Sequence, residues 1–287
     1  MSTATAPATS APASPSIPKS AHVSFLGAVR SEWLKLRTLR STWWIAGLTV
    51  VIMAGIALLG TWSLSTFIDA DPEGAAQAMG VMPNGAEFAT SGSLFGQLVL
   101  GVLGVLVVTN EYASGMVRST FAAVPRRTPV VLAKVVVLTL ISLVTSAVAI
   151  GASALVSMPF FDTLDVTIPM DSADTWQILG GVAVFLTLIA LMSFGFGLIL
   201  RHTAGAIFTV VAIAFVIPLV LQAFQTDLIQ NINKFLPMNA STAFTTTTDA
   251  GAAGMELLDP WVGFAVMVAW AVVPIAVGTV LLKSRDV

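Results

Sequence analysis

Few residues in this sequence carry side chains that could do chemistry, and they form no catalytic pattern. The chain has 287 residues, no cysteine and two histidines, His22 and His202. Without cysteine, the chain can form neither a thiolate zinc site nor a cysteine nucleophile. Its two histidines, both near the predicted inner surface, do not supply the base of an intramembrane Ser–His protease. The motifs GxxxxGK[ST], HExxH and GxSxG are also absent from the sequence, so it has no P-loop for a nucleotide. We expect no catalytic residue, no metal site and no cofactor in this chain.

The most informative polar segment is 110–129, NEYASGMVRSTFAAVPRRTP. Met116, Thr120 and Val124 have the spacing of one helical face, with Phe121 beside them. A proline that would stop such a helix follows, and then an arginine pair: Pro125, Arg126 and Arg127. A short helix with apolar side chains and a basic end could transmit force from a soluble subunit. A basic loop that only fixes the topology is the alternative.

Glu111 stands at the end of an apolar segment, 91–109. A carboxylate so close to hydrocarbon is costly unless a cation pairs with it. We therefore expect a cationic partner, with Arg30, Arg37 and Arg118 as candidates, and a solvated Glu111 as the alternative.

The elements that must position these residues are predicted to be membrane helices. The chain is 56% hydrophobic and 10% charged, with a mean hydropathy of +0.91. Soluble domains are about 25% charged, so a soluble enzyme, a disordered scaffold and a nucleic-acid binder are excluded. Bilayer spans need about 20 apolar residues, and six segments qualify: 43–67, 91–109, 130–158, 176–200, 204–224 and 261–282. The predicted fold is all-α, with six transmembrane helices in a domain over 43–287.

The charges predict the orientation of these spans. If six helices alternate, 12 of the 13 basic residues fall on one side and 12 of the 15 acids on the other. Basic loops stay cytoplasmic, so both termini are expected inside. Lys134, at the edge of the third span, is expected to reach the headgroups with its long side chain.

Residues 1–21 read as a disordered tail, and 22–42 as an amphipathic interfacial helix. On a helical projection the apolar side chains fall within an arc of about 100°: Phe25, Leu26, Val29, Trp33 and Leu36. The basic side chains lie outside that arc: Arg30, Lys35 and Arg37. A plain membrane anchor and an elbow helix that also contacts a cytoplasmic partner both fit this pattern.

Two further features concern the outer side and the spans. The outer loop 225–260 is long enough to carry function or disorder, and part of it could re-enter the membrane. Four residues could line a solute pathway by their positions: Gln97, Phe208, Thr209 and Phe215.

Three stretches of this sequence resemble a bacterial ATP-binding-cassette (ABC) exporter permease of the type 2 class, especially the actinobacterial members. They are SEWLKLRTLRSTWW at 31–44, EYASGMVRSTFAAVPRRTPVVLAK at 111–134, and DPWVGFAVMVAW with LLKSRDV near the end. The resemblance implies six helices, an N-terminal elbow helix and a bacterial plasma-membrane location. It also implies a dimer with a second permease copy or paralogue, and a separate cytoplasmic ATPase that binds ATP and Mg²⁺.

In that family the loop after the second span bears a coupling helix. The residues at the matching places here are Glu111, Gly115, Arg118, Pro125, Arg126 and Lys134. Members typically export drugs, antibiotics, peptides or envelope lipids, which fits an amphipathic or apolar solute.

Two other classes stay open from the sequence. One is a membrane anchor or sensor whose inner loop recruits a partner without transport. The other is an ion-coupled carrier, which the absence of acids within the spans disfavours. Pro218 and Pro274 interrupt two spans, and simple kinks are the favoured interpretation over unwound ion sites.

Overall fold

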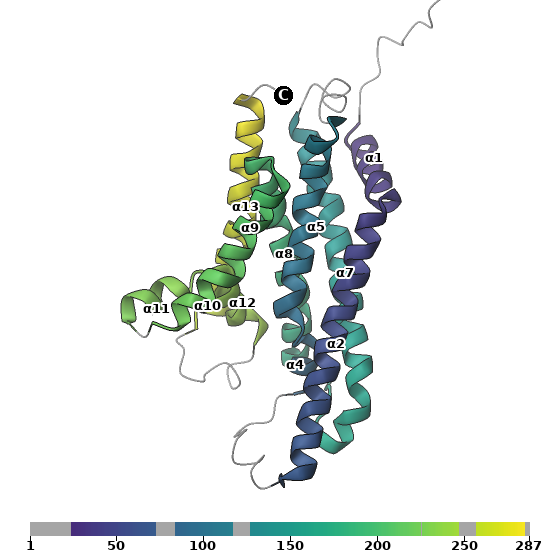
Figure 1. The fold of residues 1–287 in the computed structure, drawn as a ribbon, viewed down its shortest axis with the longest axis vertical. Helices are drawn as coiled ribbons and strands as arrows, with labels where there is room; N and C mark the ends of the chain where they lie inside the picture. The colour runs from purple at the N-terminus through teal and green to yellow at the C-terminus, as the bar shows by residue number, and fades with distance from the viewer. Residues whose placement is uncertain (1–23, 73–83, 117–126, 225, 247–256, 285–287) are drawn as a thin grey trace, which may run out of the picture.

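The computed structural model describes residues 24–72, 84–116, 127–224, 226–246 and 257–284 (Figure 1). Six helical segments in this part of the chain are long and apolar enough to cross a membrane. The first, third, fourth and sixth are single helices: α2 (Arg40–Ala70), α7 (Arg127–Leu164), α8 (Ala173–Leu200) and α13 (Pro260–Ser284). The second is α4 (Gly85–Thr90) followed by α5 (Ser93–Ala113). No strand occurs among the described residues, so the predicted all-α fold is confirmed.

Five of the six spans are longer than the sequence predicts, and α7 is the longest helix among them. α7 has 38 residues and would extend about 57 Å at 1.5 Å per residue, well beyond a hydrocarbon core of about 30 Å. Its far end packs with α2 and α4 around a separate apolar cluster: Phe88, Phe161, Leu164 and Val166. This cluster stabilises the ends of α2 and α7 beyond the predicted limits of 43–67 and 130–158. A search for apolar runs cannot predict it, because its residues come from separate segments of the chain.

The fifth span contains a change of helix type. α9 (Thr203–Val211) leads into a π-helical turn, η1 (Ala212–Val216), and then α10 (Ile217–Gln222). The Ile217 N–H donates to the carbonyl of Ala212, five residues earlier. Pro218 lacks an N–H and would clash in a regular turn, so the wider turn accommodates it. The span is therefore continuous, with a π turn where the sequence predicts a kink.

The outer segment contains two short helices, α11 (Asp227–Asn233) and α12 (Pro237–Thr245). The Trp270 Nε1 of α13 donates to the Phe235 carbonyl at 2.9 Å. Trp270 lies ten residues into α13, which is about 15 Å along its axis. The α11–α12 connection therefore lies beside α13 near the middle of its length, and re-entry of this segment into the membrane stays a prediction.

α8 is the most buried of the six spans and lies among the others. Glycines let neighbouring helices approach its backbone. A Cβ on Gly104 of α5 would collide with the Ala190 carbonyl oxygen, and one on Gly195 would lie 2.6 Å from the Cβ of Pro274 in α13. Lipid provides no hydrophobic force between helices, so such close packing supplies much of the association.

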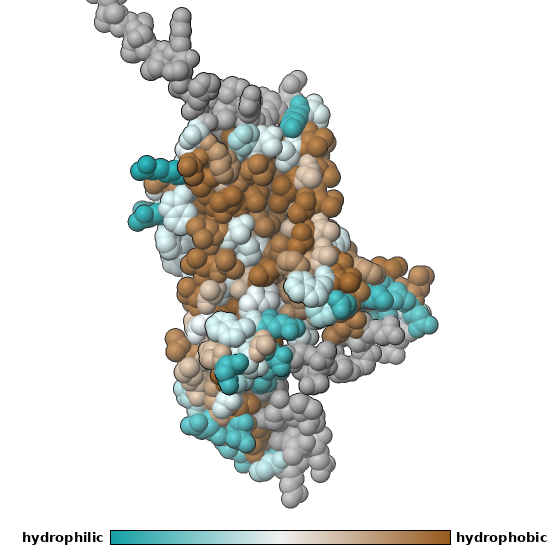
Figure 2. Space-filling model, turned by 180° about the vertical axis from the view of Figure 1, so that it is seen from behind, coloured by the Kyte–Doolittle hydropathy of each residue, from teal (hydrophilic) through white to brown (hydrophobic). Residues whose placement is uncertain are grey.

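The face shown in Figure 2 is apolar over much of its height, and hydrophilic residues gather toward the end away from α1. Large apolar side chains on α2 and α7 are exposed, among them Val51, Leu59, Val144 and Val148. A surface of this kind suits contact with lipid or with another membrane chain.

We expect Gly104→Ala to lower the stability of the bundle, because the new methyl group meets the Ala190 carbonyl. Overpacking of this kind typically costs about 1–3 kcal/mol. Gly55→Ala in α2 is the matched control, since no atom lies within 4 Å of its Cβ position. Thermal unfolding in detergent checks this, and equal melting temperatures for the two variants would contradict it.

The ends of the bundle can be assigned to sides of the membrane with single cysteines, because the chain has none of its own. α1 (Phe25–Thr38) and the end of α13 share one end of the bundle, which the charges predict to be cytoplasmic. A cysteine at the exposed position Ser284 should react only after permeabilisation, and one at Ala173 should react from outside. The reverse labelling would overturn the orientation.

Candidate functional site

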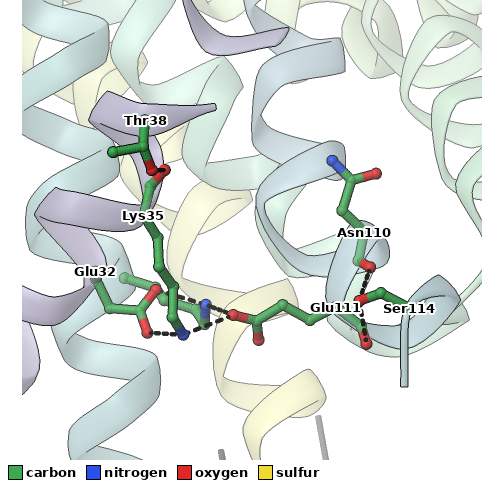
Figure 3. A network of polar contacts seen from close by, with 7 residues as sticks. Glu32, Lys35, Thr38, Asn110, Glu111 and Ser114 are labelled. Atoms are coloured by element: carbon green, nitrogen blue, oxygen red, sulfur yellow. Dashed lines mark hydrogen bonds and ion pairs between the residues drawn. The ribbon is translucent and has the colours of Figure 1, made fainter. Parts of the chain in front are cut away.

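Four charged side chains meet at the end of the bundle that holds α1 (Figure 3). Lys134 Nζ of α7 lies 2.6 Å from Glu111 Oε1 of α5 and 2.7 Å from Glu32 Oε2 of α1. Lys35 Nζ of α1 lies 2.8 Å from Glu32 Oε1 and 3.1 Å from Glu111 Oε1. The two positive and two negative charges balance. We call these residues the four-charge network.

Local structure brings the network together. Glu32 and Lys35 are three residues apart on α1, so they lie on one face of that helix. Ser24 begins α1 by accepting the Gly27 N–H, and the extended Leu39 ends it. The Trp43 indole N–H donates to the Arg37 carbonyl at 2.8 Å across this bend. The bend holds α1 against α7, where it packs.

The network is largely withdrawn from solvent. The side chains of Glu32 and Lys134 are only 5% and 7% exposed, and Lys35 is the most exposed at 27%. Burial tends to lower the pKa of the Lys35 ammonium, but hydrogen bonds and charge attraction from Glu32 and Glu111 outweigh it, and the pKa is raised above 10.5. Lys35 therefore stays charged at neutral pH, and its contribution to stability is lost only as pH rises above that ordinary value.

The predicted cationic partner of Glu111 exists, but its identity differs from the prediction. The partners are Lys35 and Lys134. Arg30 and Arg37 are exposed on other faces of α1, and Arg118 lies outside the described residues. Lys134 does not reach toward the headgroups as predicted, because two carboxylates bind its ammonium inside the bundle.

The interfacial helix is present over a shorter range than 22–42, and its packed face differs from the predicted arc. Ala28, Glu32 and Leu36, spaced four apart, are the buried residues of α1. Val29 is half-buried, whereas the remaining apolar side chains of the arc are exposed: Phe25, Leu26 and Trp33. The predicted arc was chosen by apolar side chains alone. Glu32 faces inward instead, because it forms ion pairs with Lys35 and Lys134.

The predicted coupling loop is described only at its two ends. α5 ends at Ala113, and Gly115 takes a positive φ of 71° after the Ser114 cap, a backbone that favours glycine. Met116 is half-exposed, and Arg127 begins α7. Five residues of the predicted set lie outside the described residues: Arg118, Phe121, Val124, Pro125 and Arg126. The four-charge network thus holds both ends of this loop, through Glu111 at its start and Lys134 shortly after its end.

The four residues proposed for a pathway differ in their surroundings. Gln97 is 1% exposed, and neither atom of its amide has a hydrogen-bond partner among the described residues. Phe208 of α9 is 76% exposed. The Thr209 hydroxyl donates to the Gly205 carbonyl of its own helix, and Phe215 lies in the π turn. Gln97 and Phe208 therefore share no surface within one chain, and a common pathway stays a prediction.

Sequence reasoning did not select Glu32, Lys35 and Lys134 as one site. The available signal was the small number of charged residues near the apolar spans, because such residues need partners of opposite charge. Which charges meet depends on how α1 packs against α5 and α7, and spacing along the chain does not encode that packing.

Six membrane-length helices and a buried charge network at the flanks of one loop define a multi-pass helical membrane protein. Residues 28–220 match the family model described as ABC-2 family transporter protein. This match covers about two thirds of the chain, so the protein belongs to the ABC-2 family of transporter membrane proteins. A search of curated proteins finds no significant match. The family match confirms the resemblance to a type 2 ABC permease.

We expect Lys134→Met to destabilise the protein strongly, because Glu32 and Glu111 would then share only the more exposed Lys35, and the network would carry a net negative charge. Removing one partner of a buried pair costs about 3–5 kcal/mol. Lys283→Met, at an exposed lysine of the same end of the bundle, is the matched control. Glu111→Lys should be similarly harmful, and Glu111→Lys with Lys134→Glu should recover part of the loss. Thermal unfolding measures all four variants, and a stable Lys134→Met would argue against the network.

Proposed function

We propose that this permease subunit exports an amphipathic or apolar solute and is driven by a separate cytoplasmic ATPase that docks on the loop 110–129. The observation that carries the proposal is the four-charge network, which joins both flanks of that loop to α1. A push on the loop would reach three helices together. ATP and Mg²⁺ would bind only in the partner chain, which agrees with the absence of a P-loop from this sequence.

The chemistry of the spans supports the solute class. Apart from Lys134 and Glu111 near the inner end, the predicted span cores carry no charged residue that could bind a bare ion. Their polar groups are mostly hydroxyls, and many of these donate to the carbonyl four residues earlier, as Ser146 and Ser193 do. An apolar or amphipathic molecule needs few polar contacts along such a path.

A second permease copy or paralogue completes the proposed transporter. The fifth span supports this, because one chain leaves its large apolar side chains uncovered, including Phe208, Leu219 and Val220. The proposed setting is a bacterial plasma membrane with both termini in the cytoplasm, as the basic loops predict.

We expect Arg126→Glu combined with Arg127→Glu to weaken binding of the partner ATPase by about tenfold or more. Reversing two charges at a docking surface replaces attraction with repulsion. The measurement is co-purification of the two chains and stimulation of ATP hydrolysis in vesicles. Lys283→Glu is the control at the same end of the bundle.

The result also separates the function classes. A membrane anchor would bind its partner without stimulating ATP turnover or moving a solute. An ion-coupled carrier would lose transport when the proton or sodium gradient collapses while ATP remains. Wild-type binding and turnover in the double arginine variant would overturn the docking site.

A further inference from the structure

Arg201 occupies the short turn between the fourth and fifth spans. It follows α8 directly, with a left-handed backbone (φ 54°), and its N–H donates to the Gly197 carbonyl at 2.9 Å. Only His202 separates it from α9, and the Nδ1 of His202 accepts the Gly205 N–H at 3.1 Å. The end of α8 and the start of α9 are therefore both capped. The inner end of α9 cannot shift freely without moving Arg201.

The Arg201 side chain connects this turn to two other spans. Its Nη2 donates to the Leu281 carbonyl of α13 at 3.3 Å. That carbonyl is among the last four of α13, which lack a regular backbone donor within their own helix, and it also accepts the Ser284 hydroxyl at 3.4 Å. The guanidinium carbon also lies 5.3 Å from the ring centroid of Tyr112 in α5, which is cation–π geometry. One side chain thus links the inner ends of α5, α8 and α13.

Tyr112 places this link next to the four-charge network. In the last turn of α5, Glu111 contacts Lys35 and Lys134. Tyr112, the next residue, contacts Arg201. A movement of the loop that displaces the end of α5 would act on the Arg201 guanidinium directly. The caps around Arg201 would pass that movement to α9.

The fifth span contains a π turn at which it can bend. Its π turn lies between α9 and α10, and Figure 1 shows this span leaning away from α5 toward α11. Turns of this kind interrupt the regular hydrogen-bond ladder and mark sites of helix bending. We infer that Arg201 is a positioning residue that transmits movement from the end of α5 to α9, so that the fifth span pivots at Ala212–Val216. The inference rests on the proposed function, because the ATPase supplies the movement.

The test follows the outer half of the fifth span in the complete permease–ATPase complex in lipid nanodiscs. Ala223→Cys, at the exposed position that caps α10, carries an environment-sensitive fluorophore as the sole thiol label of the permease, after cysteines of the ATPase are replaced. Mg²⁺-ATP should shift its emission. Arg201→Asn removes the guanidinium but suits the left-handed backbone. We expect it to retain ATPase binding and reduce the shift by roughly 3- to 30-fold, the range for residues that couple distant sites.

Three further variants isolate the interaction. Tyr112→Phe keeps the aromatic ring and should keep the shift, whereas Tyr112→Leu should lose it as Arg201→Asn does. Lys283→Asn removes a nearby exposed charge and should leave the shift unchanged.

The outcomes separate three explanations. A full shift in Arg201→Asn overturns the inference while the proposed function stands. Parallel loss of thermal stability, ATPase binding and the shift in Arg201→Asn also overturns it, because the residue would then serve only the architecture. An ATPase that neither binds the parent permease nor shifts its emission overturns the proposed function itself.

Discussion

The structure depends on one constraint, which is that hydrocarbon offers no hydrogen bonds to a polar group. The backbone meets this constraint within helices, and hydroxyls meet it locally, as when Thr61 donates to the Ala57 carbonyl. The buried charged groups of the network take partners from several helices, so they gather where α1, α5 and α7 meet. Gln97 is an exception among the described residues, with both amide atoms buried and without hydrogen-bond partners.

Close packing around α8 follows from the same setting. Because lipid is as apolar as the helix surfaces, helices gain more from tight contact than from exclusion of water. Gly104 and Gly195 bring α5 and α13 against α8 on different sides. These contacts hold α8 between its neighbours, whereas the fifth span leaves much of its surface uncovered. The bundle thus combines a tightly packed centre at α8 with a fifth span that has fewer contacts.

Two polar clusters meet at the last turn of α5, and they differ in kind. The four-charge network joins α1, α5 and α7 by ion pairs between opposite charges. Arg201 joins α5, α8 and α13 through an aromatic face and a carbonyl oxygen. The first surrounds the flanks of the loop on which we propose that the ATPase docks. The Arg201 contacts connect the last turn of α5 with the turn before α9. The last turn of α5 therefore takes part in both clusters.

The sequence by itself determined the class of fold, the number of spans and the need of Glu111 for a cation. These follow from composition and from the cost of charge in lipid, which are properties of residues and their neighbours along the chain. Only the tertiary structure decided that Lys35 and Lys134 are the partners, that Glu32 faces inward and that α7 continues to Leu164. Each of these depends on contacts between segments far apart in the chain. Periodicity reports one helix at a time and carries no information about which helices meet.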